Sequence, residues 1–338
     1  MITESPFFSV LIPCNNVESS ILKCLLSIDK QTFRDFECLI VDDGSSDNTA
    51  ERLRLFCQQK NKYRVIKLSE NRGISFARNL LLSISKGQYI IWIDPDDYIL
   101  PDYFEIAQKL ISKNSLDILI FNYHIKIEKE THTFEHKFNN GLLSKENIFL
   151  ALSYDWYFPS QLWNKIFKKE IFYNVRFPEK ALILEDYYVL PSLIKNAQYI
   201  YFDSRAFYVY VRRNSSLLCT KTQEKELNQF EIRLDRLKNI LEDYPNFFNV
   251  GINSLLISLY KSGSVLLQLD PEWKHGPTLK QMLVSSKLYS DHKKTLKQLI
   301  LLYCYNRYSI KFLSLVLPII KRSLQRIVVN VLCPKFFI

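Results

Sequence analysis

The chain places three carboxylates within four residues, at Asp94, Asp96 and Asp97. Strand-forming residues at 90–93 precede them, and Pro95 keeps Asp94 extended, so the cluster lies at the carboxyl end of an expected strand. Carboxylates this close repel one another unless a cation lies among them. Such oxygen donors suit Mg²⁺ or Mn²⁺, and we expect a divalent metal that arrives with the substrate. An acidic turn that only caps or solvates its loop is the alternative.

Strands and helices alternate in the part of the chain that contains this cluster. The expected strands lie at 7–13, 37–41, 64–69 and 89–93, and the expected helices begin near Val17, after Ser46 or Asp47, and at Ile74. This alternation predicts a doubly wound parallel sheet. Ligands bind such sheets at the carboxyl ends of the strands, where both acidic turns, 42–47 and 94–97, fall.

The chain has few glycines with which to bind a phosphate. Only 7 of its 338 residues are glycine, and neither G-x-G-x-x-G nor G-x-x-x-x-G-K-[ST] occurs. If a nucleoside diphosphate binds at this edge of the sheet, a metal and cationic side chains must balance its charge.

Five stretches occur in an order that is typical of one family: FSVLIPCNNVESSILKCLLSIDKQTFRDFECLIVDDGSSDNT, NRGISFARN, GQYIIWIDPDDYILPDYF, LWNKIFKKEIF and LILEDYYVLPSLI. The chain thereby resembles the family 2 glycosyltransferases of GT-A fold over about residues 7–215. The resemblance implies an α/β, Rossmann-like fold with a mostly parallel sheet and flanking helices. We expect a catalytic domain at 1–219, with a nucleotide-sugar half at 1–120 and an acceptor half at 121–219. A C-terminal helical region is expected at 220–338.

The resemblance also implies an activity. It is that of an inverting, metal-dependent hexosyl- or N-acetylhexosaminyltransferase that uses Mn²⁺ or Mg²⁺. The donor would be a nucleotide-diphosphate sugar, expected to be a UDP-sugar. The acceptor would be a hydroxyl of a glycan or glycolipid in bacterial lipooligosaccharide (lipopolysaccharide), capsule or a related surface polysaccharide. Two other classes stay open, a sugar-phosphate nucleotidyltransferase and a noncatalytic protein that binds anionic surfaces. The first usually has a glycine-rich basic loop, and the second leaves the acidic motifs without a purpose.

The resemblance assigns the donor site position by position. Asp43 is similar to the acidic residue that hydrogen-bonds the uracil ring, and Asp42 would support it. Arg78 resembles the arginine that reaches the nucleotide or the diphosphate. Asp94 and Asp96 resemble the D-x-D pair, with Asp94 toward the ribose and the metal and Asp96 as the direct metal ligand.

One position departs from the family pattern. The family usually has a tyrosine two residues after the proline that ends the first strand, where it can pack on the nucleobase. Here the proline is Pro13 and the position holds Asn15. Both are still assigned to the nucleotide site, but we expect base stacking to be weakened or replaced.

The transfer reaction needs a base for the acceptor hydroxyl. By resemblance, Asp186 in LILEDYY is that base, and Glu185 orients it or touches the acceptor. The alternative is that Asp186 and Glu185 are ordinary carboxylates in the first turn of a helix, where the helix dipole favours negative charge. By resemblance, a loop that folds over the diphosphate contains Arg212, Arg213 and Ser215. Arginine suits this role because its paired N–H donors can bind a phosphate group at two points.

Aromatic and histidine side chains supply the remaining candidates. Trp163 and Lys165 resemble the region that lines the acceptor site, with a buried core tryptophan as the alternative. His132 and His136 have a spacing that could suggest a metal. Their polar surroundings favour a solvated loop or hairpin instead.

The net charge of +10 is concentrated at the end of the chain, because residues 292–338 hold nine Lys or Arg and no Asp or Glu. These cations alternate with apolar residues, which favours an anionic membrane surface as partner and argues against nucleic acid. Packing on the protein, or a dimer seam in a homo-oligomer, is the alternative. The apolar run 312–320 is too short to span a bilayer.

The seven cysteines are odd in number and include no C-x-x-C pair, and the N-terminus lacks an apolar signal core. We therefore expect a reducing cytoplasm, with the enzyme peripheral at the inner face of the cytoplasmic membrane and the cysteines as small core residues.

Overall fold

The computed structural model describes residues 5–153, 158–212 and 222–247. The chain divides into two compact units, Met1–Ile148 with Pro159–Ser216 and Phe149–Phe158 with Leu217–Ile338. The second unit therefore includes a segment from within the expected acceptor half. The expected boundary at residue 219 stays a prediction.

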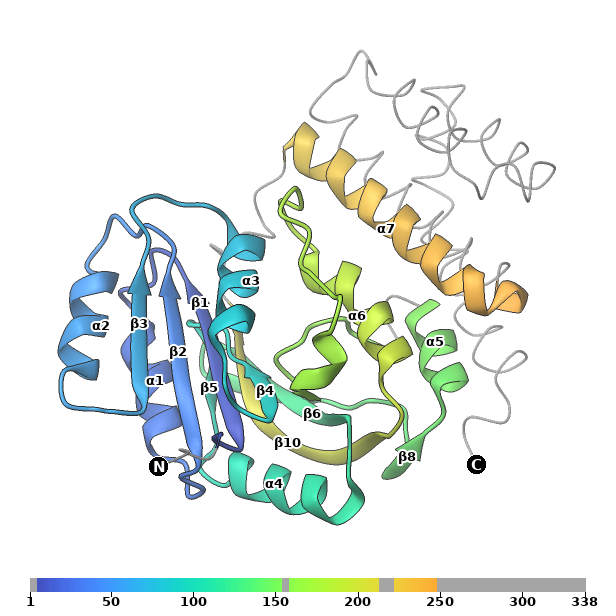
Figure 1. Ribbon diagram of the computed structural model, residues 1–338, viewed down its shortest axis with the longest axis horizontal. Coiled ribbons are helices and arrows are strands. Elements are labelled where there is room, and N and C mark those ends of the chain that lie inside the picture. Colours follow the sequence, from blue (N-terminus) through green and yellow to red (C-terminus); the bar gives the residue numbers. More distant parts are fainter. Residues whose placement is uncertain (1–4, 154–157, 213–221, 248–338) are drawn as a thin grey trace. The chain divides into compact units, whose positions relative to one another are not determined.

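Four parallel strands form the first half of a ten-stranded sheet in the order β3-β2-β1-β4. They are β1 (Phe8–Cys14), β2 (Phe36–Asp42), β3 (Tyr63–Lys67) and β4 (Tyr89–Trp92). The helices between them are α1 (Ile21–Asp29), α2 (Thr49–Cys57) and α3 (Ile74–Ile84). Figure 1 shows these strands running side by side with helices beside them. The predicted α/β alternation is confirmed here.

Beyond β4 the sheet is mixed, in the order β4-β9-β6-β10-β5. Strand β9 (Lys165–Lys168) is antiparallel to both of its neighbours, β4 and β6 (Ile118–Ile127). Strand β10 (Ile200–Arg212) is parallel to β6 and antiparallel to β5 (Tyr98–Ile99). The sheet is therefore parallel throughout only from β3 to β4, and beyond β4 just one of these pairs, β6 with β10, is parallel. A local pattern cannot show this, because it does not say which distant strand inserts next to β4.

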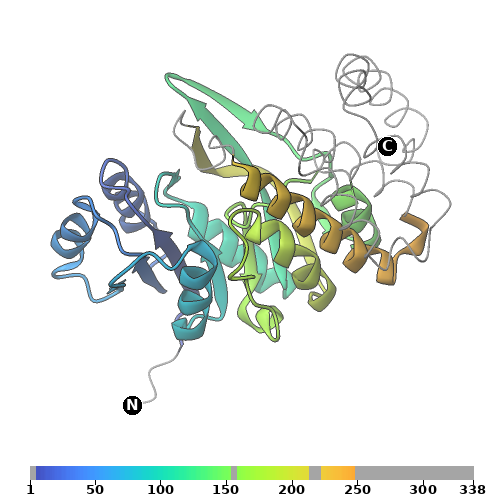
Figure 2. The ribbon, with the colours of Figure 1, turned by 90° about the horizontal axis from the view of Figure 1, so that it is seen from above.

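The remaining elements of the first unit frame this second half of the sheet. They are α4 (Tyr103–Asn114), β7 (Glu130–Phe134), β8 (Gly141–Leu143), α5 (Lys145–Ser153, which continues into the second unit), the 3₁₀ turn η1 (Lys169–Phe172) and α6 (Glu185–Asn196). Strand β7 pairs with β6, and β8 pairs with β10. Figure 2 shows β6 and β7 as a long hairpin that extends past the neighbouring helices of this unit.

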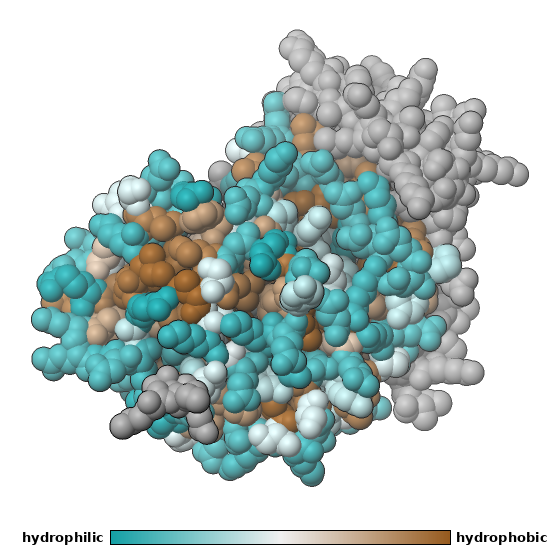
Figure 3. All heavy atoms as spheres, in the orientation of Figure 1, coloured by the Kyte–Doolittle hydropathy of each residue, from teal (hydrophilic) through white to brown (hydrophobic). Residues whose placement is uncertain are grey.

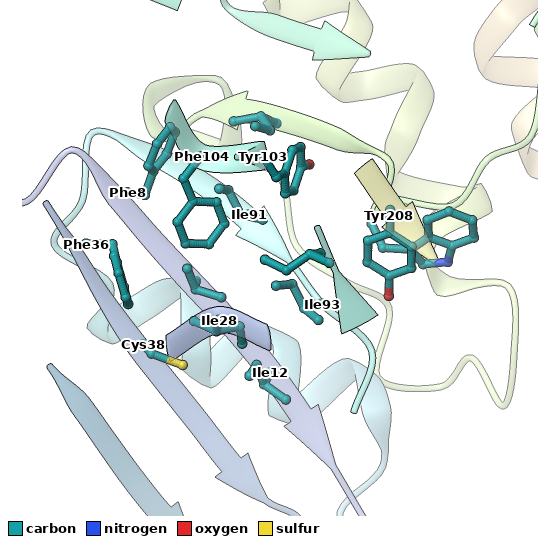
Figure 4. Packing of buried hydrophobic residues seen from close by; sticks show 14 of the residues in the cluster. Phe8, Ile12, Ile28, Phe36, Cys38, Ile91, Ile93, Tyr103, Phe104 and Tyr208 are labelled. Atoms are coloured by element: carbon teal, nitrogen blue, oxygen red, sulfur yellow. The ribbon is translucent and has the colours of Figure 1, made fainter. Parts of the chain in front are cut away.

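One apolar cluster joins α1 and α4 to the sheet. Helix α1 buries Ile21, Cys24, Leu25 and Ile28, whose spacing puts them on one face of the helix. Figure 4 shows this packing, from Phe36 and Cys38 at one end to Tyr208 at the other. Among the described residues, Cys14, Cys24, Cys38 and Cys57 are free thiols, and the first three are buried. For these three the prediction of core cysteines is confirmed. The surface in Figure 3 is largely hydrophilic, with apolar side chains showing over β2 and β3.

The described part of the second unit contains α7 (Gln223–Asp243) and a 3₁₀ turn, η3 (Pro245–Phe247). The Thr222 side chain caps α7 by accepting a hydrogen bond from the Lys225 N–H group, at 3.3 Å. The buried Arg236 donates to the carbonyl oxygen of Leu152 at 2.8 Å, which ties α7 to the segment Phe149–Phe158. Nothing in the described ranges forms a helix long and apolar enough to cross a membrane. The basic tail 292–338 lies outside those ranges.

Gly44 lets the loops that follow β2 and β3 meet. Its φ is +66°, and a Cβ there would lie 2.4 Å from the carbonyl carbon of Glu70 and 2.6 Å from the nitrogen of Asn71. We expect Gly44→Ala to lower the free energy of unfolding by at least about 2 kcal/mol, from backbone strain plus the clash. Gly73→Ala is the control, because Gly73 also has positive φ (+90°) but a Cβ there meets nothing within 4 Å. Urea unfolding measures both, and equal losses would contradict the close approach.

Candidate active site

The D-x-D loop follows β4 and is held by its last carboxylate. Asp97 is buried, and its Oδ2 accepts a hydrogen bond from the Tyr208 hydroxyl at 2.7 Å. Its Oδ1 accepts one from the Val211 N–H group at 2.7 Å. Burial raises the pKa of Asp97, and the charges of Asp94 and Asp96 raise it further. Asp97 therefore orients the loop, while Asp94 and Asp96 are partly exposed.

These two partly exposed carboxylates fit a divalent metal. Among the described residues no group of three or more His, Cys, Asp or Glu could hold a metal ion. Mg²⁺ is commonly held by one or two carboxylates together with substrate phosphates and water, and Asp94 and Asp96 supply such a donor pair. The remaining ligands would come from a bound diphosphate.

Arg78 lies between two parts of the site. This buried arginine of α3 places Nη2 3.3 Å from Glu185 Oε1 and 3.8 Å from Asp94 Oδ1. Its guanidinium also lies over the rings of Trp92 and Phe177, at 5.2 and 5.4 Å from their centroids. Burial alone would lower the pKa of Arg78, but Glu185 and Asp94 raise it. Nε and Nη1 are buried and have no hydrogen-bond partner among the described residues. Arg78 thus links the D-x-D loop to the start of α6. Its Nε and Nη1 donors are not used by these contacts.

Asp186 stands in the first turn of α6, next to Glu185. Leu184, the residue just before α6, has a φ of +65°, which is uncommon for a residue with a side chain. The Tyr187 N–H group donates to Asp186 Oδ1 at 2.7 Å. Burial raises the pKa of Asp186 to about 6, with Glu185 raising it and Arg78 opposing the shift. A carboxyl with this pKa is ionised near neutral pH and can accept a proton.

Asp43 and Asn15 lie together at the carboxyl ends of β1 and β2. Asp43 Oδ1 accepts a hydrogen bond from the Arg72 N–H group at 2.7 Å, and Oδ2 accepts one from Gly73 N–H at 2.8 Å. The Asn15 amide donates to the Asp43 carbonyl oxygen at 2.5 Å. Asp43 therefore fixes the loop before α3, and its contact with uracil stays a prediction.

Asp42 and Pro13 complete this corner of the sheet. Asp42 Oδ1 accepts a hydrogen bond from Ser45 N–H at 3.1 Å. The buried Asp42 Oδ2 has no hydrogen-bond partner among the described residues. Pro13 is buried in β1, opposite Val41 of β2.

Trp163 is in the core, which corrects the expectation that it lines the acceptor site. It is only 4% exposed. Its ring stacks on those of Tyr208 and Tyr210, with centroids 4.4 and 5.7 Å away, and meets Tyr123 edge-on at 4.6 Å. The alternative from the sequence, a buried tryptophan, is the better description.

Lys165 needs the same correction, because it is fully buried. Its Nζ donates to the carbonyl oxygens of Pro159 and Gln161, at 3.0 and 2.6 Å, and to Asn164 Oδ1 at 2.7 Å. These acceptors satisfy the three donors of an ammonium group, so Lys165 holds the loop before β9. Because a charged lysine side chain usually lies on the surface, the sequence did not indicate that Lys165 is buried.

The two histidines differ from each other. His132 is exposed on β7, as a hairpin position predicts. His136 is buried against Phe134 and Phe202, so the expectation of a solvated site was wrong for it. Burial and the charge of Lys165 lower the pKa of His136 to about 3.

The end of β10 carries Arg212, which is exposed. Arg213 and Ser215 lie outside the described residues. Sequence reasoning did not single out Tyr208, although it belongs to the aromatic run YVYVR that precedes these arginines. Its hydroxyl contacts both ends of the D-x-D loop.

The parallel half of the sheet, the acidic turns at its carboxyl edge and the carboxylates of α6 define an α/β protein with an acidic site at the edge where such sheets bind ligands. The crystal structure of S. aureus TarS 1–349 in complex with UDP-GlcNAc has the same fold, with a TM-score of 0.68 at 21% identity. That match covers 82% of this chain and 79% of the TarS chain. The fold is therefore GT-A, as predicted.

A family model described as Glycosyl transferase family 2 matches residues 9–179, about half of the chain. The chain belongs to this family. Glycosyltransferase GlyG of Streptococcus pneumoniae serotype 4 is 28% identical over 225 residues, which are 64% of this chain and 74% of GlyG. Glycosyltransferase GlyA of the same organism is 30% identical over 217 residues, 62% of this chain. The match spans only 31% of GlyA.

Proposed function

We propose that this protein is an inverting, metal-dependent glycosyltransferase that moves a hexosyl or N-acetylhexosaminyl group from a UDP-sugar to a hydroxyl of a glycan or glycolipid. The observation that carries the proposal is the position of Arg78 between Asp94 and Glu185. Through these two contacts, Arg78 connects the D-x-D loop, which we assign to the donor, with the α6 carboxylates, which we assign to the acceptor.

In this proposal the residues of the chain share the work of one in-line displacement. Asp186 accepts the proton of the attacking hydroxyl, and the Arg78–Glu185 ion pair fixes the start of its helix. Arg78 and Arg212 contribute positive charge toward the diphosphate, and Asp43 with Asn15 shapes the nucleobase end. Mn²⁺ or Mg²⁺ held by Asp94 and Asp96 would supply Lewis-acid stabilisation of the leaving diphosphate.

The names and complexes of similar proteins support this choice of donor and acceptor. TarS was crystallised with UDP and with UDP-GlcNAc. A Pyrobaculum calidifontis mannosyltransferase of the same fold (TM-score 0.52, 14% identity) was crystallised with GDP-Man and Mn²⁺. Bacillus subtilis GgaB, a minor teichoic acid biosynthesis protein, is 28% identical over 244 residues. We therefore place the acceptor among bacterial surface polysaccharides, a group that includes lipooligosaccharide and capsule.

A screen of nucleotide sugars tests the proposed function. The protein is incubated with each donor and Mn²⁺, and free nucleoside diphosphate and pyrophosphate are measured. We expect UDP release from one UDP-sugar. Pyrophosphate chemistry would instead indicate a nucleotidyltransferase, and no product with any donor would favour a noncatalytic binding protein.

The pKa of Asp186 predicts how transfer depends on pH. The base must be ionised, so a pKa of about 6 makes the rate fall as the pH drops through 6 and level off above about pH 7. Burial is the main cause of this raised pKa, the charge of Glu185 raises it further, and the charges of Arg78 and Lys165 lower it. Initial rates at saturating substrates between about pH 5 and pH 8 measure the acidic limb. Unfolding temperatures over the same range serve as the control. A rate that stays level below pH 6 in a folded enzyme would exclude Asp186 as the base.

We also propose that the tail 292–338 docks on an anionic membrane surface at the inner face of the cytoplasmic membrane. Each basic residue near such a surface is worth about 1 kcal/mol, and the apolar residues between the cations add burial. Truncation before Phe312 should abolish sedimentation with anionic liposomes but leave nucleotide-sugar hydrolysis intact. Full-length binding should weaken steeply with salt. A full-length protein that ignores these liposomes at low salt would instead place the tail in the core or in a homo-oligomer.

A further inference from the structure

One tyrosine side chain links both ends of the D-x-D loop. The Tyr208 hydroxyl accepts a hydrogen bond from the Asp94 N–H group at 3.0 Å and donates one to Asp97 Oδ2 at 2.7 Å. Inside the loop, Asp97 N–H donates to the Asp94 carbonyl oxygen at 3.1 Å. The hydroxyl thus closes a ring of hydrogen bonds around the turn that carries Asp96.

The protein holds Tyr208 itself in one place. Its side chain is 1% exposed, and its ring stacks on Trp163 with a centroid distance of 4.4 Å and an interplanar angle of 17°. Its backbone lies opposite Ile99 in the pairing of β10 with β5. Figure 4 shows Tyr208 at the end of the apolar cluster, beside β5. A rotamer change would therefore break packing as well as hydrogen bonds, so the hydroxyl is a rigid reference point for the loop.

The same contacts connect the loop to the end of β10. Asp97 Oδ1 accepts a hydrogen bond from Val211 N–H at 2.7 Å, one residue before Arg212. Both oxygens of this buried carboxylate are thus used within the fold. Asp97 is therefore not available to a ligand, which leaves Asp94 and Asp96 on the accessible side of the turn.

We propose that Tyr208 is a positioning residue for metal binding, acting through Asp94 and Asp97 to hold the Asp94 and Asp96 carboxylates in the arrangement that binds a divalent cation. Tyr208 does not itself contact the cation. Partners that orient metal ligands in this way typically change metal affinity about 10- to 100-fold when they are mutated. The inference rests on the proposed metal-dependent function.

Tyr208→Phe tests the proposal, because it removes one hydroxyl and keeps the ring that stacks on Trp163. Mn²⁺ is titrated into the full-length protein with saturating UDP, and free Mn²⁺ is followed by its electron paramagnetic resonance signal. We expect the Mn²⁺ dissociation constant to rise at least about tenfold. UDP binding in EDTA should change less than twofold, and transfer should recover as Mn²⁺ is raised.

Tyr123→Phe is the matched control. Tyr123 also packs on Trp163, and its hydroxyl makes no hydrogen bond within the part of the chain that the structure describes. Its Mn²⁺ affinity should equal that of the wild type. Unchanged Mn²⁺ affinity in Tyr208→Phe would overturn the inference alone. Equal losses of Mn²⁺ and metal-free UDP binding would overturn it too, by showing a general structural role. A wild-type protein that binds no Mn²⁺ with UDP would overturn the proposed metal dependence as well.

Discussion

Asp186→Asn should abolish transfer while the donor still binds. The substitution is nearly isosteric and keeps an oxygen that can accept the hydrogen bond from Tyr187 N–H, so the start of α6 should be retained. An amide cannot accept the acceptor's proton, and removal of a general base typically costs about 10²- to 10⁴-fold in rate. Calorimetry with the donor and single-turnover transfer assays measure the two properties separately.

Glu185→Gln is the informative comparison for this experiment. Glu185 is buried in an ion pair with Arg78, so its loss should disturb the site without removing the base itself. We expect a smaller fall in rate than for Asp186→Asn. If Asp186→Asn instead weakens donor binding and leaves transfer near normal, Asp186 is structural and Glu185 becomes the candidate base.

The sequence predicted the parts of the site that depend on local pattern. The alternation of strands and helices up to Trp92 predicted four parallel strands, and the positions of Asp43 and Asp94 at strand ends followed from it. The types and spacing of Asp94, Asp96 and Asp186 indicated carboxylate chemistry before any contact was visible. The prediction of the strands is confirmed because strand and helix periods are properties of short segments. The roles of the three carboxylates stay proposals.

Contacts between distant segments could not be predicted in this way. Asp97 and Tyr208 are 111 residues apart, and the pairing of β10 with β5 brings them together. The Arg78–Glu185 ion pair likewise needs α3 and α6 to be adjacent. Trp163 and Lys165 were placed in the acceptor site because residue type alone does not reveal burial. Their burial depends on their neighbours in the fold, which are two tyrosine rings for Trp163 and three oxygen acceptors for Lys165.

Asp96→Asn, and separately removal of metal by EDTA, should each silence the enzyme. The proposed leaving group is a diphosphate, whose negative charge grows as the sugar departs. Arg78 alone cannot balance it, because its guanidinium is already shared between Glu185 and Asp94. Loss of a transition-state contact of this kind costs roughly 3–4 kcal/mol, or several hundredfold in rate.

Asp102→Asn is the control for Asp96→Asn, because Asp102 is an exposed carboxylate just downstream whose side chain makes no cap hydrogen bond to α4. It should leave the rate and the Mn²⁺ requirement unchanged. Adding excess Mn²⁺ after EDTA should restore the transfer rate of the wild type and of Asp102→Asn. The rate of Asp96→Asn should recover only weakly, because this variant lacks the proposed direct metal ligand. Full turnover by the chelated, metal-free wild type would show that Asp94 and Asp96 have another role. In that case the two carboxylates would be better described as loop residues of the nucleotide site, with Arg78 and Arg212 carrying the diphosphate charge.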